Sequence, residues 1–347
     1  MIGIVRLLRC AARHLLMLSV LAGLYIPDAF ADLLVGGGGE QIYRYDDKSG
    51  KFLGILIPTG SGGLNNVQGM TVGPDRKLYM SSFGTREVLR FDGRTVEAFI
   101  PPGTGGMGAP NDVAFGPDGN FYVADGFFGT NSILRFNGRT GAFIGVFATG
   151  GGIRQPNRMA FGPTGDLYVG NAFSSDVLRF HGDTGLAFPA PGLSGAIFVP
   201  GAPGPFNVEL AVSTEGTLAV TTGASPGLRY YDGRTDALLR LASPDVTNVS
   251  DMRFGPEGDL YLTIYASASV QRFNSRSGAF LGEFVTPGSG GLNRAISLTF
   301  TCPADHHPAD RARHCPPLKH AAGSGDAHSG SPKGEDADGK SMLRLPF

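Results

Sequence analysis

The sequence predicts an all-β protein made from a repeated unit, and three observations indicate this class. Short apolar runs recur along the chain in pairs, and the two runs of a pair are joined by Gly-Pro-x-Gly or a close equivalent. The 347 residues include 54 Gly and 24 Pro, a composition typical of many short strands joined by tight turns. Apolar residues within a run stand at consecutive positions, as they do in strands that are buried on both faces.

Each repeated unit contains two strand pairs. Pro fixes φ at the second position of the first turn and the closing Gly accepts a left-handed conformation, so the first pair is a β-hairpin. It is complete in five copies, at 69–80, 110–125, 157–169, 208–220 and 250–262. The second pair occurs in six copies, at 42–54, 88–100, 133–145, 177–188, 228–240 and 270–282. Four strands with a period of about 45 residues are typical of one blade of a β-propeller.

The sixth copy of the first hairpin is divided between two distant parts of the chain. Residues 295–300 (AISLTF) match its first strand, and residues 33–37 (LLVGG) match its second. Pairing of these two segments would close a ring of blades and leave no open sheet edge. The sequence therefore predicts a six-bladed β-propeller over residues 32–300, with the sixth blade closed by the N- and C-terminal strands.

Residues 1–31 have the pattern of a secretory signal peptide. Arg6, Arg9 and Arg13 precede a short apolar stretch at 15–26, and a small-x-small cleavage pattern ends at Ala31. The apolar stretch is shorter than the roughly 20 residues that a membrane span needs. We expect an exported protein, periplasmic or extracellular, with no membrane span after cleavage. Its net charge of −1 gives no electrostatic basis for binding nucleic acid.

The segment 301–347 has a different composition from the repeats. It is rich in His, Pro, Gly, Ala, Asp and Ser and has no strand pattern, so we expect a disordered tail. Cys302 and Cys315 lie in this tail and are the only cysteines after residue 31. An exported protein favours a disulfide between them, and a Cys-His metal clip is the alternative.

One position in the first strand of each unit differs from copy to copy. It lies three residues before the last residue of the strand and is occupied by Gly69, Asp112, Arg158, Glu209, Asp251 and Ser297. The innermost strand of a propeller blade lines the central channel, so we expect these side chains, with Asn111 beside them, to meet at the channel mouth.

This set of side chains permits three interpretations. Asp112, Glu209 and Asp251 could hold a hard cation such as Ca²⁺ through carboxylate oxygens. Arg158 could instead bind a carboxylate of a ligand. The third interpretation is a charged channel in which these residues pair with one another.

Other repeated or exceptional residues are expected to have structural roles. An arginine occupies the same third-strand position in all six units, as Arg44, Arg90, Arg135, Arg179, Arg229 and Arg272. A single-ligand site seldom needs six copies, so we expect these stems to pack between blades. Asp125 should fix the loop that follows it. The long connection 189–207 could be a lid or partner surface on the ligand face, or simply a spacer.

Two segments resemble a known family. PNDVAFGPDGNFYVAD (110–125) and NSILRFNGRTGAFIGVF (131–147) are similar to NHL-repeat six-bladed propellers, and the resemblance extends over all six units. The gluconolactonase/regucalcin group and the streptogramin B lyases have similar propellers. The resemblance to the gluconolactonase group implies a divalent cation, with Asn111, Asp112, Glu209 and Asp251 as the nearest matches to its ligands. The Glu-Gly-Pro-x-Trp segment of that group is missing here, because the chain has no Trp.

The sequence favours binding over catalysis. The related lyases rely on His, but His181 is the only His between residues 32 and 300, and it stands at a turn between outer strands. We therefore expect a monomeric binding or scaffold module that uses its loop face and central channel, with a protein, peptide or glycan partner. The alternative is a metal-dependent, gluconolactonase-like lactone or ester hydrolase, or a lyase, with Ca²⁺ at the channel mouth.

Overall fold

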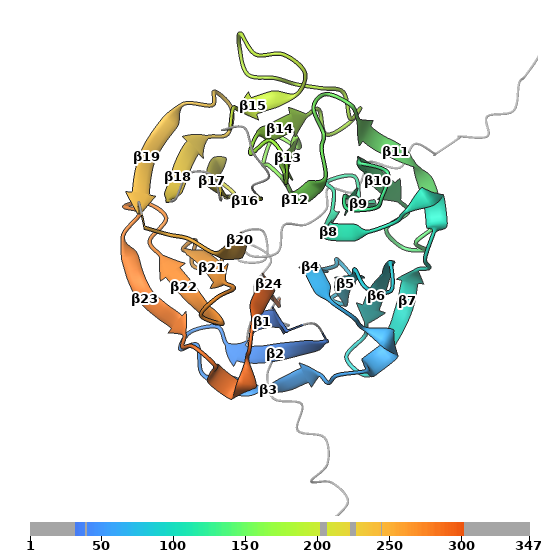
Figure 1. Cartoon of the computed structure of the whole chain (residues 1–347), viewed down its shortest axis with the longest axis vertical. Coiled ribbons are helices and arrows are strands. Elements are labelled where there is room, and N and C mark those ends of the chain that lie inside the picture. The colour runs from blue at the N-terminus through green and yellow to red at the C-terminus, as the bar shows by residue number, and fades with distance from the viewer. Residues whose placement is uncertain (1–31, 39, 202–206, 223–226, 244, 302–347) are drawn as a thin grey trace, which may run out of the picture.

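The computed structural model describes residues 32–301 except 39, 202–206, 223–226 and 244. Within this part of the chain, six four-stranded sheets are arranged as blades around a central axis (Figure 1). The predicted all-β six-bladed propeller is therefore confirmed. The expected signal peptide (1–31) and the cysteines of the expected tail, Cys302 and Cys315, lie outside the described residues.

The blades are named here in order around the ring. Blade 1 contains β24 (Ala295–Phe300), β1 (Asp32–Gly37), β2 (Gln41–Asp46) and β3 (Phe52–Ile57). Blade 2 contains β4 (Val67–Val72), β5 (Leu78–Ser82), β6 (Glu87–Phe91) and β7 (Val96–Ile100). Blade 3 contains β8 (Pro110–Phe115), β9 (Phe121–Asp125), β10 (Ser132–Phe136) and β11 (Phe143–Thr149). Blade 4 contains β12 (Pro156–Phe161), β13 (Leu167–Asn171), β14 (Val177–Phe180) and β15 (Ile197–Val199). Blade 5 contains β16 (Val208–Val212), β17 (Thr217–Thr222), β18 (Leu228–Asp232) and β19 (Leu238–Ser243). Blade 6 contains β20 (Val249–Phe254), β21 (Leu260–Ile264), β22 (Ser269–Phe273) and β23 (Phe280–Val285). Three single-turn 3₁₀ helices connect blades, η1 (Ser61–Gly63), η2 (Thr104–Gly106) and η3 (Ser289–Gly291).

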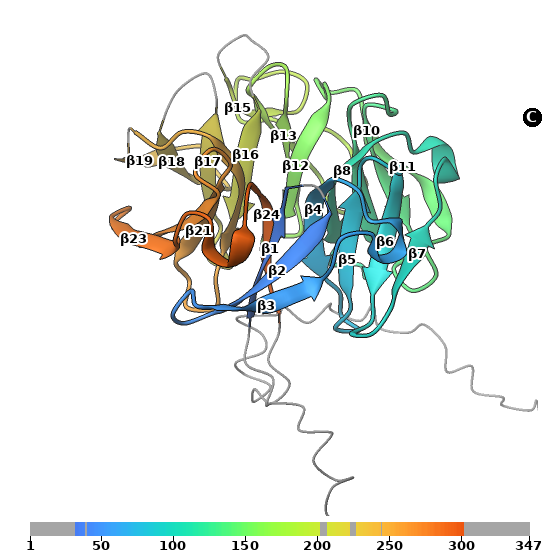
Figure 2. The same cartoon turned by 60° about the horizontal axis from the view of Figure 1, so that its bottom comes forward.

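The ring is closed in blade 1 by the two ends of the propeller. β1 pairs antiparallel with β24, with Leu33 opposite Phe300 and Val35 opposite Leu298 (Figure 2). The backbone N–H of Asp32 donates to Thr301 Oγ1 at 2.7 Å, and the N–H of Thr301 donates to the carbonyl of Asp32 at 2.9 Å. The predicted split hairpin is thus confirmed: β1 is flanked by β24 and β2, and β24 is the innermost strand of blade 1.

The core lies between neighbouring blades, where an aromatic ring of one blade meets an aromatic ring of the next. Tyr79 of β5 packs edge-on against Phe115 of β8, with ring centroids 5.0 Å apart. Tyr122 packs in the same way against Phe161 at 4.9 Å, and Tyr261 against Phe300 at 5.0 Å. Such a pair contributes about 0.5–1.5 kcal/mol beyond its burial. The repeated Tyr of the second strand therefore has a repeated packing role.

Five of the six arginines occupy the same position in the third strand of their blades, and the contacts described for them support the expected structural role. The expectation is wrong for Arg229, which stands one residue earlier, opposite Val220, while Tyr230 takes the equivalent position opposite Ala219. Arg44 pairs with Asp32 at 2.6 Å, and Arg272 pairs with Asp259 at 2.8 Å. The guanidinium of Arg179 lies over the rings of Phe188 and Phe198, at 3.9 and 4.2 Å from their centroids. These arginines hold strands and blades together rather than forming a shared ligand site.

Of the alternatives for the connection 189–207, a lid or partner surface on the ligand face or a spacer, the part that is described forms no lid. Residues 197–199 are β15, the outermost strand of blade 4, and Ala190 and Phe198 are buried between blades 4 and 5. The connection from β14 to β15 runs on the face where the innermost strands end, because β14 pairs antiparallel with β15. Residues 202–206 are outside the described part.

In the part that is described, there is no helix with the length and hydropathy needed to span a membrane.

Candidate functional site

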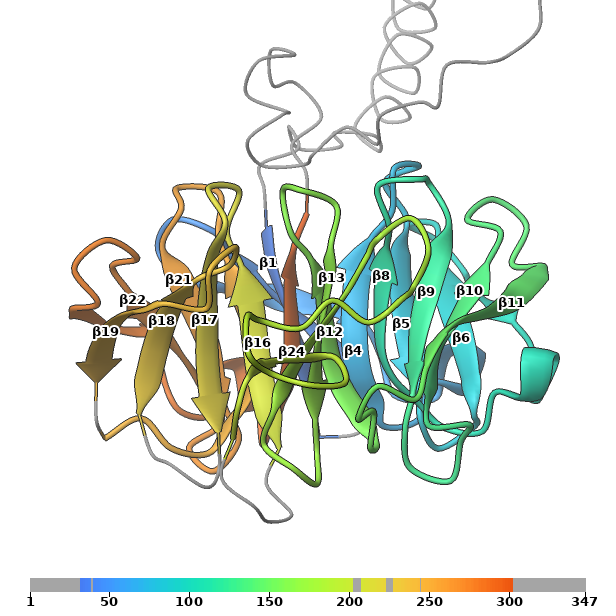
Figure 3. The same ribbon diagram turned by 90° about the horizontal axis from the view of Figure 1, so that it is seen from above.

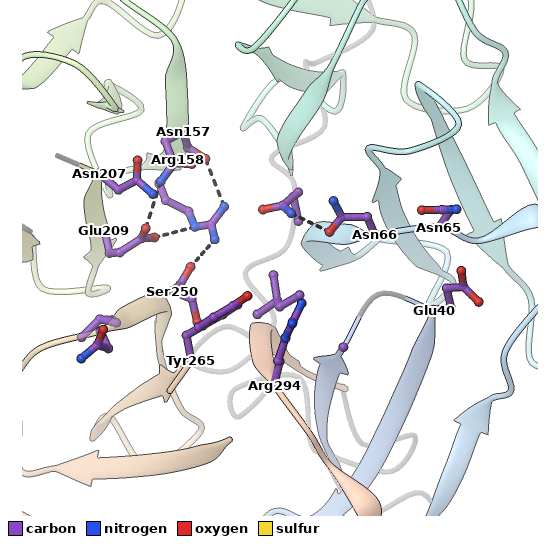
Figure 4. Close-up of a pocket in the computed structure, with 15 residues that line it drawn as sticks. Glu40, Asn65, Asn66, Asn157, Arg158, Asn207, Glu209, Ser250, Tyr265 and Arg294 are labelled. Carbon is purple, nitrogen blue, oxygen red and sulfur yellow. Dashed lines mark hydrogen bonds and ion pairs between the residues drawn. The ribbon is translucent and has the colours of Figure 1, made fainter. Parts of the chain in front are cut away.

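The innermost strands of all six blades begin on one face of the propeller, which we call the mouth face. On the opposite face β1 begins and β24 ends (Figure 3). A pocket of about 610 Å³ opens at the mouth of the channel (Figure 4). Residues that line it come from the starts of β4, β12, β16, β20 and β24, from the loops before them, and from the β1–β2 and β21–β22 loops. Strands from most of the ring thus converge on one cavity.

Side-chain amides dominate the pocket wall. Six of the lining residues are Asn65, Asn66, Gln68, Asn157, Asn207 and Asn248. Asn66 and Asn248 have φ of 57° and 58°, the left-handed conformation that Asn tolerates. These two asparagines therefore turn the chain before their strands and also line the pocket. Asn111 does not line the pocket, because its Nδ2 donates to the carbonyl of Pro156 at 3.0 Å and ties blade 3 to blade 4.

Arg158 and Glu209 form a buried ion pair at the pocket wall. Nε of Arg158 lies 2.7 Å from Oε2 of Glu209, and each side chain is only 3% exposed. Asn157 Nδ2 donates to the other carboxylate oxygen of Glu209 at 2.9 Å. Arg158 also donates from Nη2 to the carbonyl of Ser250, so it links β12 in blade 4 to β20 in blade 6 (Figure 4). This pairing supports the interpretation in which the channel charges satisfy one another.

Asp112 and Asp251 are engaged by backbone amides. Asp112 accepts from the N–H of Val113 and, in the next blade, from the N–H of Met159, both at 2.9 Å. Asp251 repeats this arrangement, accepting from Met252 at 2.8 Å and from Leu298 of blade 1 at 3.0 Å. Each carboxylate therefore joins the innermost strands of two adjacent blades.

Arg253 connects these two carboxylates across the channel. Its Nη2 lies 3.4 Å from Oδ1 of Asp112 in blade 3, and its Nε lies 3.9 Å from Oδ1 of Asp251. Arg158 adds a longer contact to Asp251 at 3.7 Å. Two guanidinium groups and three carboxylates thus form one network beneath the mouth.

Burial and pairing shift the pKa values of this network. Burial raises the pKa of Glu209 to about 7, although the positive charge of Arg158 opposes the shift. Burial also raises the pKa of the Asp112 carboxyl, against the opposing pull of Arg253 and Arg158. Burial alone would lower the pKa of Arg158, but attraction to Glu209, Asp251 and Asp112 raises it. Arg158 therefore stays charged, while Glu209 can change its charge near neutral pH.

The expected Ca²⁺ site is not supported by this geometry. In the described part of the chain, no group of three or more His, Cys, Asp or Glu side chains is arranged to hold a metal ion. Ca²⁺ needs six to eight oxygen ligands, but the oxygens of Asp112, Glu209 and Asp251 already face N–H donors and two arginines. The side chains as placed do not fit a resident cation.

Of the five residues that the sequence proposed for the channel mouth, only Arg158 and Glu209 line the pocket. Asp112, Arg158, Glu209 and Asp251 do meet in one network, while Asn111 bonds backbone beside it. Arg253 was missed, although one alignment could have found it. The position before the last residue of each innermost strand holds Thr71, Ala114, Ala160, Ala211, Arg253 and Thr299. Glu40, Tyr265 and Arg294 were also missed, because they line the pocket from loops or strand ends that the repeat does not mark.

Comparisons with known proteins support the fold alone. No protein-family model matches the chain, and no curated protein matches it. A chain in the crystal structure of a nidogen/laminin complex is similar with a TM-score of 0.61 and 13% identity, over 79% of this chain and 99% of that chain. The PQQ-bound form of aldose sugar dehydrogenase from Streptomyces coelicolor is similar with a TM-score of 0.52 and 19% identity, over 78% and 89% of the two chains. The NHL family therefore stays a resemblance of sequence.

Proposed function

We propose that this protein is a binding module that takes a segment of a partner polypeptide into the mouth pocket. The observation that carries the proposal is the ring of six side-chain amides around a pocket of about 610 Å³. Each amide has both a donor and an acceptor, as a peptide group has. Nε2 of Gln68 already donates to Oδ1 of Asn66, and Nδ2 of Asn157 already donates to Glu209. The volume is in the range of about 300–1,000 Å³ that suits a small ligand, and thus a short segment rather than a folded domain.

The charges at the pocket agree with a polar but uncharged segment. Nε of Arg158 lies 2.7 Å from Oε2 of Glu209, so the guanidinium faces this carboxyl group and not the pocket opening. Arg294, on the rim, has its guanidinium 5.5 Å from the ring centre of Tyr265. Supporting this class of partner, the propeller-like chain of 13% identity comes from a protein complex. Export, proposed from residues 1–31, would place that partner in the periplasm or outside the cell.

The hydrolase alternative has one observation in its favour. Glu209 lines the pocket and has a pKa of about 7, and a carboxyl with such a pKa could carry a proton at neutral pH. His181 offers no help there, because its ring stacks on Phe188 with centroids 4.1 Å apart, in the β14–β15 connection. A lactone and ester screen on the wild type and Glu209→Gln would show turnover lost in the variant if this alternative held.

The binding proposal is tested by selecting peptides on the full-length protein. A displayed library of random peptides is enriched on the wild type, and the dissociation constants of the selected peptides are then measured. Asn207→Ala and Arg294→Ala should each weaken binding about fivefold, the effect of about 1 kcal/mol for one hydrogen-bonding group. Both side chains are exposed in the pocket wall, so their loss should spare the fold.

Asn120→Ala is the matched control. Asn120 lies in the β8–β9 turn on the opposite face and bonds Asp118, so this variant should bind as the wild type does. Failure to enrich any peptide, or equal binding by all three variants, would contradict the proposed function.

A further inference from the structure

The loop between β9 and β10 departs from the repeat. It has six residues (126–131), whereas the corresponding loops have four between β5 and β6 (83–86) and between β21 and β22 (265–268), and five between β13 and β14 (172–176). Like those loops it lies on the mouth face, because it follows the second strand of its blade. The longer loop carries two adjacent aromatic residues, Phe127 and Phe128.

Phe127 and Phe128 form an exposed aromatic cluster with Phe173 of the β13–β14 loop, which we call the aromatic platform. Their side chains are 38%, 81% and 41% exposed, respectively. The ring of Phe127 lies 6.2 Å from that of Phe128 and 6.1 Å from that of Phe173, so the platform joins blade 3 to blade 4. Clustered apolar side chains at a surface mark interaction sites more often than single ones do.

The aromatic platform adjoins the mouth pocket. A side chain placed at Gly126 would meet the carbonyl of Pro156 at 2.8 Å, and Pro156 precedes the pocket residue Asn157. On the other loop, the N–H of Ala172 donates to the carbonyl of Gln155 at 3.1 Å. On the β9–β10 loop, Oδ1 of Asn131 accepts from the N–H of Gln155 at 2.8 Å. Both aromatic loops are therefore bonded to Gln155, just before β12, where the pocket wall begins.

Phe128 holds its exposed position in an unfavourable conformation. Its φ is 60°, at the third position of a turn closed by the N–H of Gly129 donating to the carbonyl of Gly126 at 2.9 Å. A positive φ at this position is normally supplied by Gly or Asn, and a bulky side chain there is strained. An exposed aromatic side chain is poorly solvated, and a positive φ disfavours a bulky residue. Neither property therefore explains why position 128 holds Phe.

Asp125 makes this loop rigid. Its buried carboxylate accepts from the N–H groups of Gly108 at 2.9 Å and Ala109 at 2.7 Å, and from the N–H and hydroxyl of Thr130 at 2.6 and 2.9 Å. The role expected for Asp125 is thereby confirmed. Because the loop is fixed before any ligand arrives, little conformational entropy is lost when something docks on it.

We infer that the aromatic platform is the anchor site for an apolar side chain of the polypeptide segment whose backbone enters the mouth pocket. This inference rests on the proposed function and specifies its partner: the segment carries an aromatic or aliphatic residue next to the part held by the amides. Preorganised aromatic side chains at the edge of a polar site supply the large contact area on which binding depends most.

Phe128→Asn tests the platform in a way that separates binding from folding. Asn tolerates a positive φ, so the melting temperature of the full-length variant should equal or exceed that of the wild type. The affinity for peptides selected on the wild type should fall at least tenfold. Phe280→Asn is the control: Phe280 is 53% exposed on β23, far from the mouth, so its loss should leave the affinity unchanged.

A double-mutant cycle identifies the contact. Replacing the apolar residue of a selected peptide by Ala should weaken binding to the wild type but add little to the loss in Phe128→Asn. Unchanged affinity in Phe128→Asn, or a clear drop in its melting temperature, would overturn the inference while pocket binding could still stand. Failure to select any peptide would remove the proposed function itself. If the protein bound glycans on an array and Phe128→Asn abolished this binding, the occupant would be a glycan and the proposed polypeptide would be excluded.

Discussion

At the scale of single residues, side-chain length decides what one repeated position does. Asp112, Glu209 and Asp251 occupy the same place in three innermost strands. The short aspartates accept from the backbone amides beside them and in the next blade, and their contacts to arginine are longer, at 3.4 to 3.9 Å. The longer Glu209 extends to Arg158 and Asn157 at the pocket. At this one position, Asp112 and Asp251 therefore hold neighbouring blades together, whereas Glu209 forms part of the pocket wall.

The raised pKa of Glu209 predicts a pH-dependent stability. The folded protein holds a proton on Glu209 up to a pKa of about 7, whereas the ordinary value is 4.5. Between these values the folded state binds more protons than the unfolded state, so stability falls as pH rises from 4.5 through 7. Glu209→Gln should remove this dependence. The free energy of unfolding of the variant, relative to the wild type, should rise by on the order of 1 kcal/mol per pH unit in this window.

Urea denaturation at several pH values between 4 and 8 measures this difference. Glu215→Gln, at an exposed turn, serves as the control and should run parallel to the wild type. The assignment of a raised pKa to Glu209 would be contradicted if the free energy of unfolding of Glu209→Gln, relative to the wild type, stayed constant or fell as the pH rises.

At the scale of elements, the repeat fixed the strands with good accuracy. The residues used to align the copies are the last residues of the innermost strands, Val72, Phe115, Phe161, Val212, Phe254 and Phe300. The hairpin turn that follows each one sets the register, so a motif repeated five times locates its strands. The β9–β10 loop escaped notice because Gly, Thr and Asn around Phe127 and Phe128 are typical of any turn. Its meaning depends on the neighbouring loop that holds Phe173.

Closure through β24 predicts different effects for two truncations. A chain that ends at residue 294 lacks β24 and exposes the buried side chains Leu33 and Val35 of β1. We expect its melting temperature to drop by more than about 10 °C, or its cooperative transition to disappear, because lost burial costs about 25 cal/mol per Å². A chain that ends at residue 301 keeps this pairing and should melt within about 2 °C of the full-length protein. Differential scanning calorimetry compares the three chains, and a stable chain ending at 294 would show that closure matters little.

At the scale of the whole molecule, the propeller brings distant residues into one network. Arg253 and Asp112 are 141 positions apart in the chain yet face each other across the channel. Charges contributed by blades 3, 4, 5 and 6 compensate one another beneath the mouth, and side-chain amides remain at the opening. The molecule therefore offers a ligand a polar surface with little net attraction for ions.

This charge balance predicts indifference to Ca²⁺. Since a ligand stabilises only a state that binds it, the melting temperature should change by less than about 1 °C between excess Ca²⁺ and a chelator. Elemental analysis of the purified protein should accompany the melting curves. A stoichiometric cation that is lost in the triple variant Asp112→Asn, Glu209→Gln, Asp251→Asn would restore the metal-dependent hydrolase as the better explanation.

The sequence by itself determined the six-bladed architecture, the divided closing blade and the four charged residues that meet in the channel. These follow from local patterns, because a repeat that cannot bury its own surface must stack on its neighbours. Only the tertiary structure decided which oxygen faces which donor, and hence that Asp112 and Asp251 hold backbone amides instead of a cation. It also decided that Arg253 spans the channel and that three Phe residues from two loops form one surface. Such contacts join residues far apart in the chain, and their distances depend on the packing of every blade between them.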